Sequence, residues 1–341
     1  PDTYLNLEFS FSLREYLLKN TIIEEIVLLP ANVFESATVD TTILMTKKKI
    51  PPKRFYENDV SIKLINKKSN SIDFNEFNKE FTISTQIWNS EKSFLIRSNS
   101  DEIKIIQKID QNFNKLESFA EMFSGIKCYE VGKGNPPQTQ QIRDEKPFTK
   151  EYKVDSNWLP FFEGKHIERY QLNWNQNSWI NYGSWLAAPR EKENFQDEKI
   201  LIRKIVSNTL ICNYVPYTSY CNTLLFVLKL TSQAKIGYQS LLGILNSNFI
   251  GWYYRHKFQI SDDDTFPQIM IRDILKFPIP NNNSVEIENY VNNLQKQSTH
   301  LLKLKSKFLG LLQDNLALSS VSKKLDTFYE SDFKCFLSEL K

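Results

Sequence analysis

The stretch from Leu13 to Lys48, LREYLLKNTIIEEIVLLPANVFESATVDTTILMTKK, decides how the start of the chain folds. Its first apolar residues have the spacing of one helical face, which predicts a helix that ends at Asn20. TIIEEIVLLP is apolar and rich in β-branched residues, which predicts a strand closed by Pro30. TTILMTKK predicts a second strand. A helix followed by two strands is typical of the last part of an α/β domain rather than of its beginning.

Glycine is distributed unevenly. All 9 glycines lie at Gly125 or later. A Rossmann-type nucleotide loop needs glycine where the backbone turns tightly and approaches its ligand. Such a loop is therefore excluded from residues 1–124.

The composition indicates a globular protein. With 341 residues, 41% of them hydrophobic and 24% charged, the chain is long enough for two ordinary domains. A net charge of +3 neither indicates nor excludes nucleic acid as a partner. The 4 cysteines form no CxxC pair and the 3 histidines are scattered, which argues against a zinc site. No membrane span and no signal peptide are recognisable, so we expect a cytoplasmic protein of bacterial type.

The rest of the chain divides into three regions by pattern. Residues 51–122 are mixed and polar, and we expect a connecting region that ends in a helix over residues 101–122. In residues 123–283 short apolar segments alternate with turns, which is typical of a β-rich unit. An apolar stripe predicts a long amphipathic helix over residues 285–312, so residues 284–341 are expected to be C-terminal helices.

Two groups of segments resemble a known family. The Leu13–Lys48 stretch resembles the end of the catalytic domain in TaqI-like adenine-N6 DNA methyltransferases and their type II restriction-modification fusions. The later blocks resemble the TaqI-like C-terminal specificity domain, which is the target-recognition domain; they are FFEGKHIERY, WINYGSWLAAPRE, KILIRKI, LLGILNSNFIGWYY and FPQIMIRDILKFPIP. The resemblance implies an α+β chain. Residues 1–50 would be the C-terminal remnant of an α/β methyltransferase domain, followed by the target-recognition domain and C-terminal helices.

The resemblance also implies a function. The parent protein would bind S-adenosylmethionine and methylate an adenine flipped out of double-stranded DNA, while this domain reads the sequence. In that family the cofactor loop and the Asn-Pro-Pro-aromatic motif both precede the segment found here at Val33–Phe34. We therefore expect the chain to be the C-terminal part of a larger polypeptide, with no catalytic residue, metal or cofactor of its own. Its partners would be DNA and the N-terminal catalytic part, and Mg²⁺ would be needed only by a fused endonuclease. Whether the chain itself is an enzyme stays open.

Phe34 is the candidate for stacking on the target base. The resemblance implies that the phenylalanine of this block packs against the flipped adenine, and stacking recovers part of the cost of extruding the base. A core phenylalanine between two strands is the alternative, and the sequence leaves both open.

The sequence Asn135-Pro136-Pro137-Gln138 imitates the catalytic motif. Gln138 has no ring to stack on a base, and the segment follows Phe34 instead of preceding it. Asn and Pro are common in turns, so we interpret the segment as a loop, one that could face DNA.

Basic and aromatic residues alternate in the middle of the chain. Arginine can read guanine in the major groove, and lysine can neutralise phosphates. A solvated surface with core aromatics is the alternative in an arbitrary protein, but the resemblance favours DNA. The expected DNA-binding residues are Lys165, His166, Arg169, Tyr182, Arg190, Lys199, Arg203 and Lys204.

Two other functions stay as alternatives. Asp155, Glu163 and Lys165 resemble the arrangement of a metal-dependent endonuclease. The long C-terminal helix could instead dock a separate catalytic subunit, which would make the chain a non-enzymatic scaffold. The acidic run SDDDTF, residues 261–266, is interpreted as a solvated loop, because three consecutive Asp residues cannot face one ion.

Overall fold

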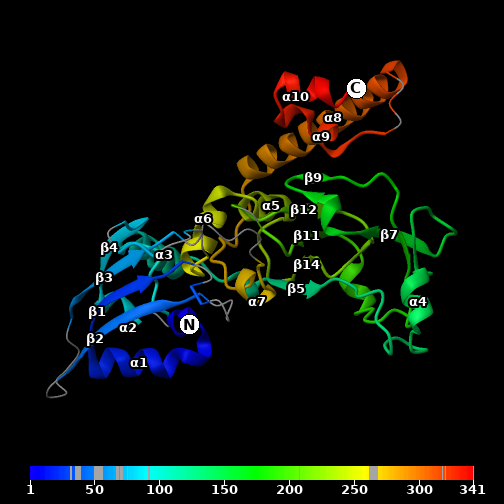
Figure 1. Cartoon of the computed structure of the whole chain (residues 1–341). Coiled ribbons are helices and arrows are strands. Elements are labelled where there is room, and N and C mark those ends of the chain that lie inside the picture. The colour runs from blue at the N-terminus through cyan, green and yellow to red at the C-terminus, as the bar shows by residue number, and fades with distance from the viewer. Residues whose placement is uncertain are drawn as a thin grey trace.

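The chain folds into three consecutive parts (Figure 1). They are an N-terminal unit (residues 2–112), a central unit (114–283) and a helical tail (285–340). The computed structural model describes residues 1–30, 33–34, 40–49, 57–66, 69, 72–74, 76–90, 93–206, 208–260, 268–316, 318 and 320–340.

The N-terminal unit is built on a four-stranded sheet of order β2-β1-β3-β4. Helix α1 (Phe11–Asn20) leads directly into β1 (Thr21–Leu28), as predicted. β1 pairs antiparallel with β2 (Thr42–Lys48) and parallel with β3 (Asp59–Leu64). β4 (Lys79–Ser84) completes the sheet antiparallel to β3. Since β1 and β3 are parallel, their carboxyl ends meet at the same edge.

Residues 59–112 differ from the expected connecting region, because they belong to this sheet and its cover. Every second residue of β3 is buried, which fixes it as a half-buried strand rather than a loop. Helices α2 (Thr85–Ser90) and α3 (Ser100–Asn112) follow β4. Trp88 and Ile103 join the core beneath the sheet.

Helix α3 ends ten residues before the expected position. It begins at a capping box in which Asn99 and Glu102 satisfy each other's backbone N–H groups. It stops at Phe113, which has extended backbone and donates its N–H to the carbonyl of Ile109. Residues 120–122, expected to end the helix, instead belong to β5 (Ala120–Ser124). Apolar residues continue at a similar spacing beyond the end of α3, because β5 is also partly buried.

The central unit contains two four-stranded sheets. The first has the order β12-β11-β14-β5, is antiparallel throughout, and comprises β5 (Ala120–Ser124), β11 (Lys199–Arg203), β12 (Cys212–Val215) and β14 (Leu225–Leu230). The second has the order β13-β7-β10-β6 and comprises β6 (Thr149–Lys150), β7 (Trp158–Phe162), β10 (Trp179–Asn181) and β13 (Tyr220–Cys221). One core, which includes Leu201, Val227 and Phe162, joins the two sheets.

Helices cover the other face of the first sheet. They are α5 (Tyr238–Leu245), α6 (Asn248–Lys257) and α7 (Ile271–Ile274). The apolar segment YQSLLGILNSNFIGWYYRHKF predicts one buried helix, but the structure has two, α5 and α6. They are separate because the Ser247 hydroxyl caps α6 and accepts from the N–H of Ile250. Asn246 precedes it and is fully buried; its side chain bonds both the N–H and the carbonyl of Cys212 in β12.

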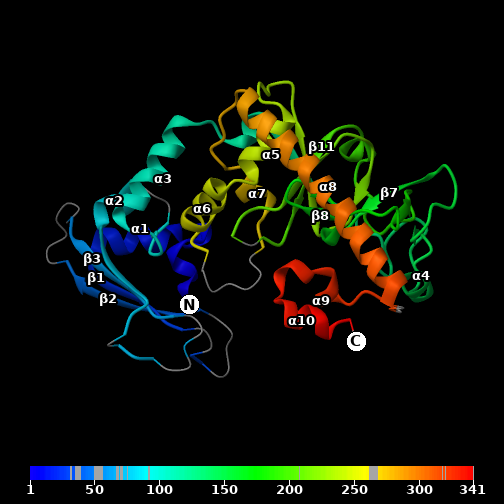
Figure 2. The ribbon, with the colours of Figure 1, turned by 90° about the horizontal axis from the view of Figure 1, so that it is seen from above.

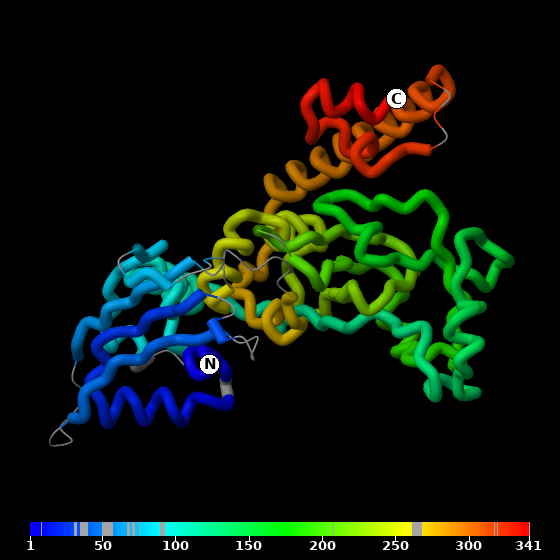
Figure 3. Tube along the Cα trace, in the orientation of Figure 1, coloured from blue at the N-terminus to red at the C-terminus, as the bar shows by residue number. Residues whose placement is uncertain are grey.

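The tail consists of one long helix and two short ones that fold back on it (Figure 3). Helix α8 (Val285–Leu316), predicted to end at residue 312, packs its first turns against α5. A Cβ on Gly243 would lie 2.6 Å from a methyl group of Ile287, so glycine permits this close approach. The sequence predicts one further helix over Asp326–Leu340. The structure has the short helix α10 (Phe333–Ser338) within this range and another, α9 (Lys323–Asp326), before it. Three aromatic rings hold them to α8; they are those of Phe308, Phe328 and Phe336.

Helices α3 and α6 lie side by side where the N-terminal and central units meet (Figure 2). The Asp110 carboxylate accepts from the Tyr253 hydroxyl at 2.6 Å and pairs with Lys257 Nζ at 2.8 Å. The backbone N–H of Arg97 donates to Gln259 Oε1 at 2.7 Å. The two units are therefore joined by polar contacts. The combination of helices and sheets in the chain confirms the predicted α+β class. Among the helices described, none has the length and apolar character needed to cross a membrane.

Candidate nucleic-acid interface

Two of the expected DNA-binding residues lie in the core. Lys199 is fully buried, and its Nζ donates to the carbonyls of Asp197 at 2.8 Å and Tyr217 at 2.7 Å. Burial lowers the pKa of Lys199 to about 8. His166 is 3% exposed, and its Nδ1 accepts from the N–H of Glu163. Burial lowers the pKa of His166 as well. We remove both residues from the expected set of DNA contacts, because their side-chain nitrogens form hydrogen bonds with buried backbone groups and do not reach the surface.

Four more of these residues have partners in the protein. One guanidinium nitrogen of Arg169 donates to the carbonyl of Asn246 at 2.7 Å. The other three pairs are Arg203 with Glu168 at 3.4 Å, Lys165 with Glu163 at 2.8 Å, and the Tyr182 hydroxyl with the carbonyl of Arg190 at 2.8 Å. The Tyr182 ring also stacks on Tyr220, with centroids 4.6 Å apart. Lys165 and Arg169 are exposed, so they can still meet a phosphate, whereas Tyr182 is a supporting residue.

Arg190 is the most available residue of the set. It is exposed, its φ of 65° is unusual for arginine, and its carbonyl is fixed by Tyr182. Within the described part of the chain, its guanidinium forms no ion pair or hydrogen bond. Lys204 is half-buried, with its backbone held between Leu224 and Ile269. The structure does not bring all eight residues into one patch, since Lys199 and His166 are buried. Of the others, Arg203 ends β11 and Lys204 follows it, whereas Arg190 lies in the connection after β10.

The Asn135–Gln138 segment is a loop, as interpreted from the sequence. The buried side chain of Gln138 holds the loop by hydrogen bonds to backbone groups. Gln138 is 2% exposed; its Nε2 donates to the carbonyls of Cys128 and Trp185, both at 2.8 Å. Its Oε1 accepts from the N–H of Glu130 at 2.9 Å. Gln138, which stands where the Asn-Pro-Pro-aromatic motif has its aromatic residue, therefore has a structural role. Helix α4 (Gln140–Glu145) follows after its N-cap Thr139 and has no buried residue.

The three residues of the nuclease alternative do not form a metal site. Glu163 is paired with Lys165, and Asp155 Oδ1 accepts from the N–H of Asn157 at 2.7 Å. No cluster of three acidic, His or Cys side chains able to hold a metal ion occurs among the residues that the structure describes.

Phe34 is 55% exposed and belongs to the connection between β1 and β2. Its neighbours at residues 31–32 and 35–39 lie outside the described residues, as does the 261–267 segment with its acidic run. The side chain is accessible, so base stacking by Phe34 stays a prediction.

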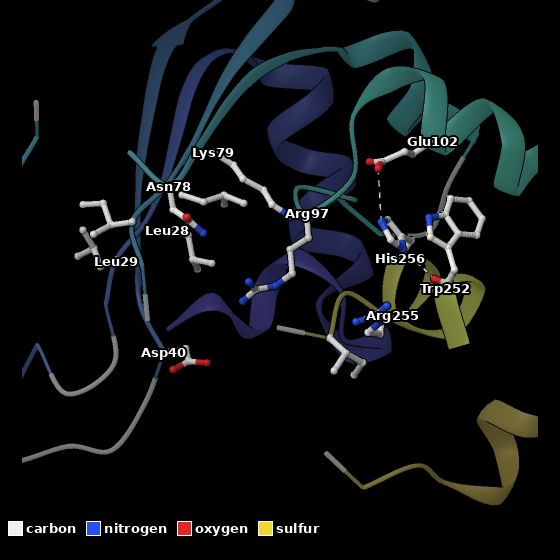
Figure 4. Close-up of a pocket in the computed structure, with 13 residues that line it drawn as sticks. Leu28, Leu29, Asp40, Asn78, Lys79, Arg97, Glu102, Trp252, Arg255 and His256 are labelled. Atoms are coloured by element: carbon white, nitrogen blue, oxygen red, sulfur yellow. Dashed lines mark hydrogen bonds and ion pairs between the residues drawn. The ribbon is translucent and has the colours of Figure 1, made fainter. Parts of the chain in front are cut away.

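A pocket of about 360 Å³ opens at the junction of the two units (Figure 4). Its floor is the edge where β1 and β3 end, at Leu28 and Leu64. Three cationic side chains line it; they are Lys79, Arg97 and Arg255. Sequence analysis missed this pocket, because its residues come from six separate stretches of the chain and each of the three cations lies in a different stretch.

Comparison with known protein families accounts for both units. Residues 9–119 match the N-6 DNA Methylase family, and residues 159–279 match the TaqI-like C-terminal specificity domain. The chain thus has a segment similar to N-6 DNA methylases followed by one similar to the TaqI-like specificity domain. The family resemblance expected from the sequence is therefore confirmed. The specificity domain covers most of the central unit, and the methylase segment reaches past β4 and α3 to residue 119. Residues 280–341, the helical tail, match a domain of unknown function.

One curated relative and several solved structures are similar over long stretches. A putative type II restriction enzyme and methyltransferase of Methanocaldococcus jannaschii is 28% identical over 313 residues. The match covers 89% of this chain but only 24% of the relative, so the chain spans about a quarter of that protein. The type IIG restriction endonuclease BpuSI aligns with 11% identity and a TM-score of 0.37, over 86% of this chain and 41% of that one. The type IIL enzyme MmeI, solved with DNA, aligns with 11% identity and a TM-score of 0.46, over 97% and 43%.

Proposed function

We propose that the chain recognises a specific sequence in double-stranded DNA as the C-terminal part of a type II restriction-modification polypeptide. The observation that carries the proposal is the match of residues 159–279 to the TaqI-like specificity domain, which follows the match of residues 9–119 to the N-6 DNA Methylase family. A domain that reads DNA must be held rigidly against the domain that acts on it. The α3–α6 contacts through Asp110 supply that connection.

Exposed basic residues of the specificity domain supply the contacts. Arg190, Lys165, Arg169 and Lys204 are the members of the expected set that stay accessible. Their long cationic side chains neutralise phosphates, and an arginine can also bond a guanine edge. Phe34, at the connection between β1 and β2, supports the extruded adenine.

A selection from random duplex DNA tests this proposal. The chain should enrich a defined sequence, because base contacts discriminate by about 1–3 kcal/mol per base pair. Arg190→Ala should weaken binding to that sequence. Lys324→Ala in the tail, where the lysine pairs with Glu339 at 3.5 Å, is the matched control and should not. Retention of duplexes without any sequence preference would reject the proposal.

We infer further that the catalytic part of the same polypeptide docks on the N-terminal unit. β2 is the edge of the described sheet, and an edge strand exposes backbone N–H and carbonyl groups that another strand can pair with. Ile43 and Met45 on β2 are 37% and 48% exposed. Leu13 and Tyr16 on the adjacent α1 are 47% and 61% exposed. Apolar side chains exposed on neighbouring elements are typical of an interface.

The docked part would bring S-adenosylmethionine and the Asn-Pro-Pro-aromatic motif, and methylation of adenine would belong to the assembled polypeptide in the cytoplasm. Mixing the separately produced catalytic part with this chain should give a complex that transfers methyl groups to duplex DNA. Met45→Lys should weaken the complex. Met270→Lys, at a methionine of similar exposure (44%) in the central unit, should not. Equal effects of the two substitutions would count against docking at β2.

A further inference from the structure

Helix α8 carries a continuous row of exposed apolar side chains. The members of this α8 row are each between 37% and 64% exposed; they are Tyr290, Leu294, Leu301, Leu304, Phe308 and Leu311. Gln297, which is also exposed, completes the row, so that its members follow one another at alternating steps of four and three residues. Residues at these steps share one side of an α-helix, and the row therefore extends for about 30 Å along α8.

A different face of α8 attaches the helix to the rest of the chain. Ile287 and Val291 pack into the core of the central unit, and Leu309 is buried farther along the helix. These three residues lie roughly 100° around the helix from the middle of the α8 row. Phe308 is shared by both faces, because its ring also packs against that of Phe328 in the folded-back tail. In the described part of the chain, the other apolar members of the row stay exposed to solvent.

The alternation of four and three residues is the spacing that a second helix requires. In a coiled coil, each residue of such a row inserts between four side chains of the facing helix. Single exposed leucines are common on soluble proteins, whereas a continuous apolar row is typical of an interaction site. We therefore expect the partner of the α8 row to be an α-helix with an apolar row of its own.

The charges of α8 favour a second copy of the same helix that runs in the opposite direction. The first half, residues 285–298, carries two Glu and one Lys, a net charge of −1, and the second half, residues 299–316, carries three Lys and one Asp, a net charge of +2. Lys305 is paired with Asp326 at 2.8 Å, which leaves Lys303 and Lys307 as exposed cations of the second half. Two antiparallel copies place the acidic half of each helix beside the basic half of the other, whereas parallel copies place like charges together.

The position of α8 in the fold also suits an antiparallel pair. Its first turns pack against α5, and towards its far end the helix rises away from the sheets of the central unit (Figure 1). In an antiparallel pair the two central units lie at opposite ends of the joined helices. A parallel pair would bring both central units to the same end, where they compete for space.

We propose that the chain forms a homodimer in which the α8 rows of two copies pack against each other in antiparallel orientation. The same surface is used by both copies, so a twofold axis closes the assembly at two chains. Gln297 is the polar member of the row, and a polar residue in such a seam fixes the register at a cost in stability. Each dimer carries two specificity domains related by the twofold axis. The proposal does not depend on DNA recognition, because α8 lies outside the specificity domain.

The test is sedimentation velocity of the full chain over a range of concentrations, without DNA. The wild type should have twice the mass of the monomer above a dissociation constant on the order of 10 μM, and the mass of the monomer well below it. Leu301→Lys and Leu304→Lys place a charge in the seam, so each should raise this constant at least about tenfold. Leu316→Lys is the matched control, because this leucine lies on the same helix outside the row and is 47% exposed, so the constant should not change.

Replacing the polar member of the row gives a test in the opposite direction. Gln297→Leu completes the apolar row, so the dissociation constant of the dimer should fall several-fold. Circular dichroism and thermal unfolding identify any variant that does not fold, and if a lysine variant fails, Gln297→Leu decides. An unchanged or higher constant for a folded Gln297→Leu would overturn the proposal.

The orientation is tested by cross-linking with a short thiol-specific reagent. In an antiparallel pair, residues near the middle of the row lie beside their own copies, whereas residues at position 286 lie roughly 40 Å apart. His300→Cys should therefore give a covalent dimer and Glu286→Cys should not, with the wild type as the control for the native cysteines. Equal cross-linking of the two variants would overturn the antiparallel arrangement.

Two further outcomes would reject the proposed dimer. A wild-type chain that stays monomeric at concentrations well above 100 μM would overturn the proposal and leave the α8 row to another partner, such as a helix of the catalytic part. An equal loss of association in Leu301→Lys and Leu316→Lys would show that the row is not the contact. Neither result bears on DNA recognition, which the selection from random duplexes tests separately.

Discussion

At the scale of single residues, Gln138 shows that a segment resembling the Asn-Pro-Pro-aromatic motif can serve to stabilise a loop. The side chain makes three hydrogen bonds to backbone groups of Cys128, Glu130 and Trp185. A phenyl ring in its place could make none of these three bonds, and a phenol hydroxyl has one hydrogen, so it could not donate to both carbonyls. The polar residue is therefore required by the loop itself, and the loop in turn positions the exposed helix α4.

Replacing Gln138 should be costly. Gln138→Ala leaves buried backbone groups without partners, and we expect a loss of about 2–4 kcal/mol in the free energy of unfolding, as measured by urea denaturation. Gln140→Ala, at an exposed glutamine two residues away, should change it by less than about 0.5 kcal/mol. Similar values for the two variants would contradict the structural role.

Lys199 gives a prediction about pH. Its pKa is about 8 in the folded protein, below the ordinary 10.5. Between pH 8 and 10.5 the Lys199 amine holds more protons in the unfolded chain than in the folded protein, so the free energy of unfolding rises with pH in this window. Below pH 8 the amine is protonated in both states, and its contribution does not change with pH. The free energy of unfolding should therefore increase by up to about 3 kcal/mol from pH 8 to 10.5 relative to Lys199→Met, which lacks the group. Parallel pH curves for the two proteins would refute this assignment.

At the scale of elements, period and composition predicted α1, β1, β2 and α8 well, and they predicted the β-rich character of the central unit. The errors occur where tertiary contacts override the pattern. α3 ends early because Phe113 becomes extended, and the α5–α6 helix is split because Ser247 caps and Asn246 bonds Cys212. Lys199 and His166 were expected at the surface because sequence alone does not say which basic residues satisfy buried carbonyls or turns.

The α3–α6 junction can be tested as an element. Asp110→Ala removes the acceptor of Tyr253 and the partner of Lys257, and should lower the free energy of unfolding by about 1–2 kcal/mol. Small-angle scattering should show a larger radius of gyration as the two units separate. Asp101→Ala is the control, because that carboxylate is 88% exposed and pairs only locally with Lys104 at 3.3 Å. An unchanged scattering profile for Asp110→Ala would mean that other contacts fix the units.

At the scale of the whole molecule, the order of segments was the informative feature of the sequence. The family, the α+β class and the succession of methylase segment, specificity domain and helices all follow from it. The junction pocket did not, because the fold assembles it from residues as far apart as Leu28 and Ile260. Neither the pairing of β3 with β1 nor the packing of α6 against α3 has a local signature, so only the structure shows that these cations converge.

The most direct test of DNA recognition is a competition titration. A labelled duplex with the selected sequence is bound to the chain at 0.15 M salt and displaced by unlabelled duplex of either the same or a scrambled sequence. Specific recognition predicts that the scrambled duplex competes at least about a thousandfold more weakly. Equal competition by both duplexes would contradict the account, because the chain would then bind DNA by charge alone.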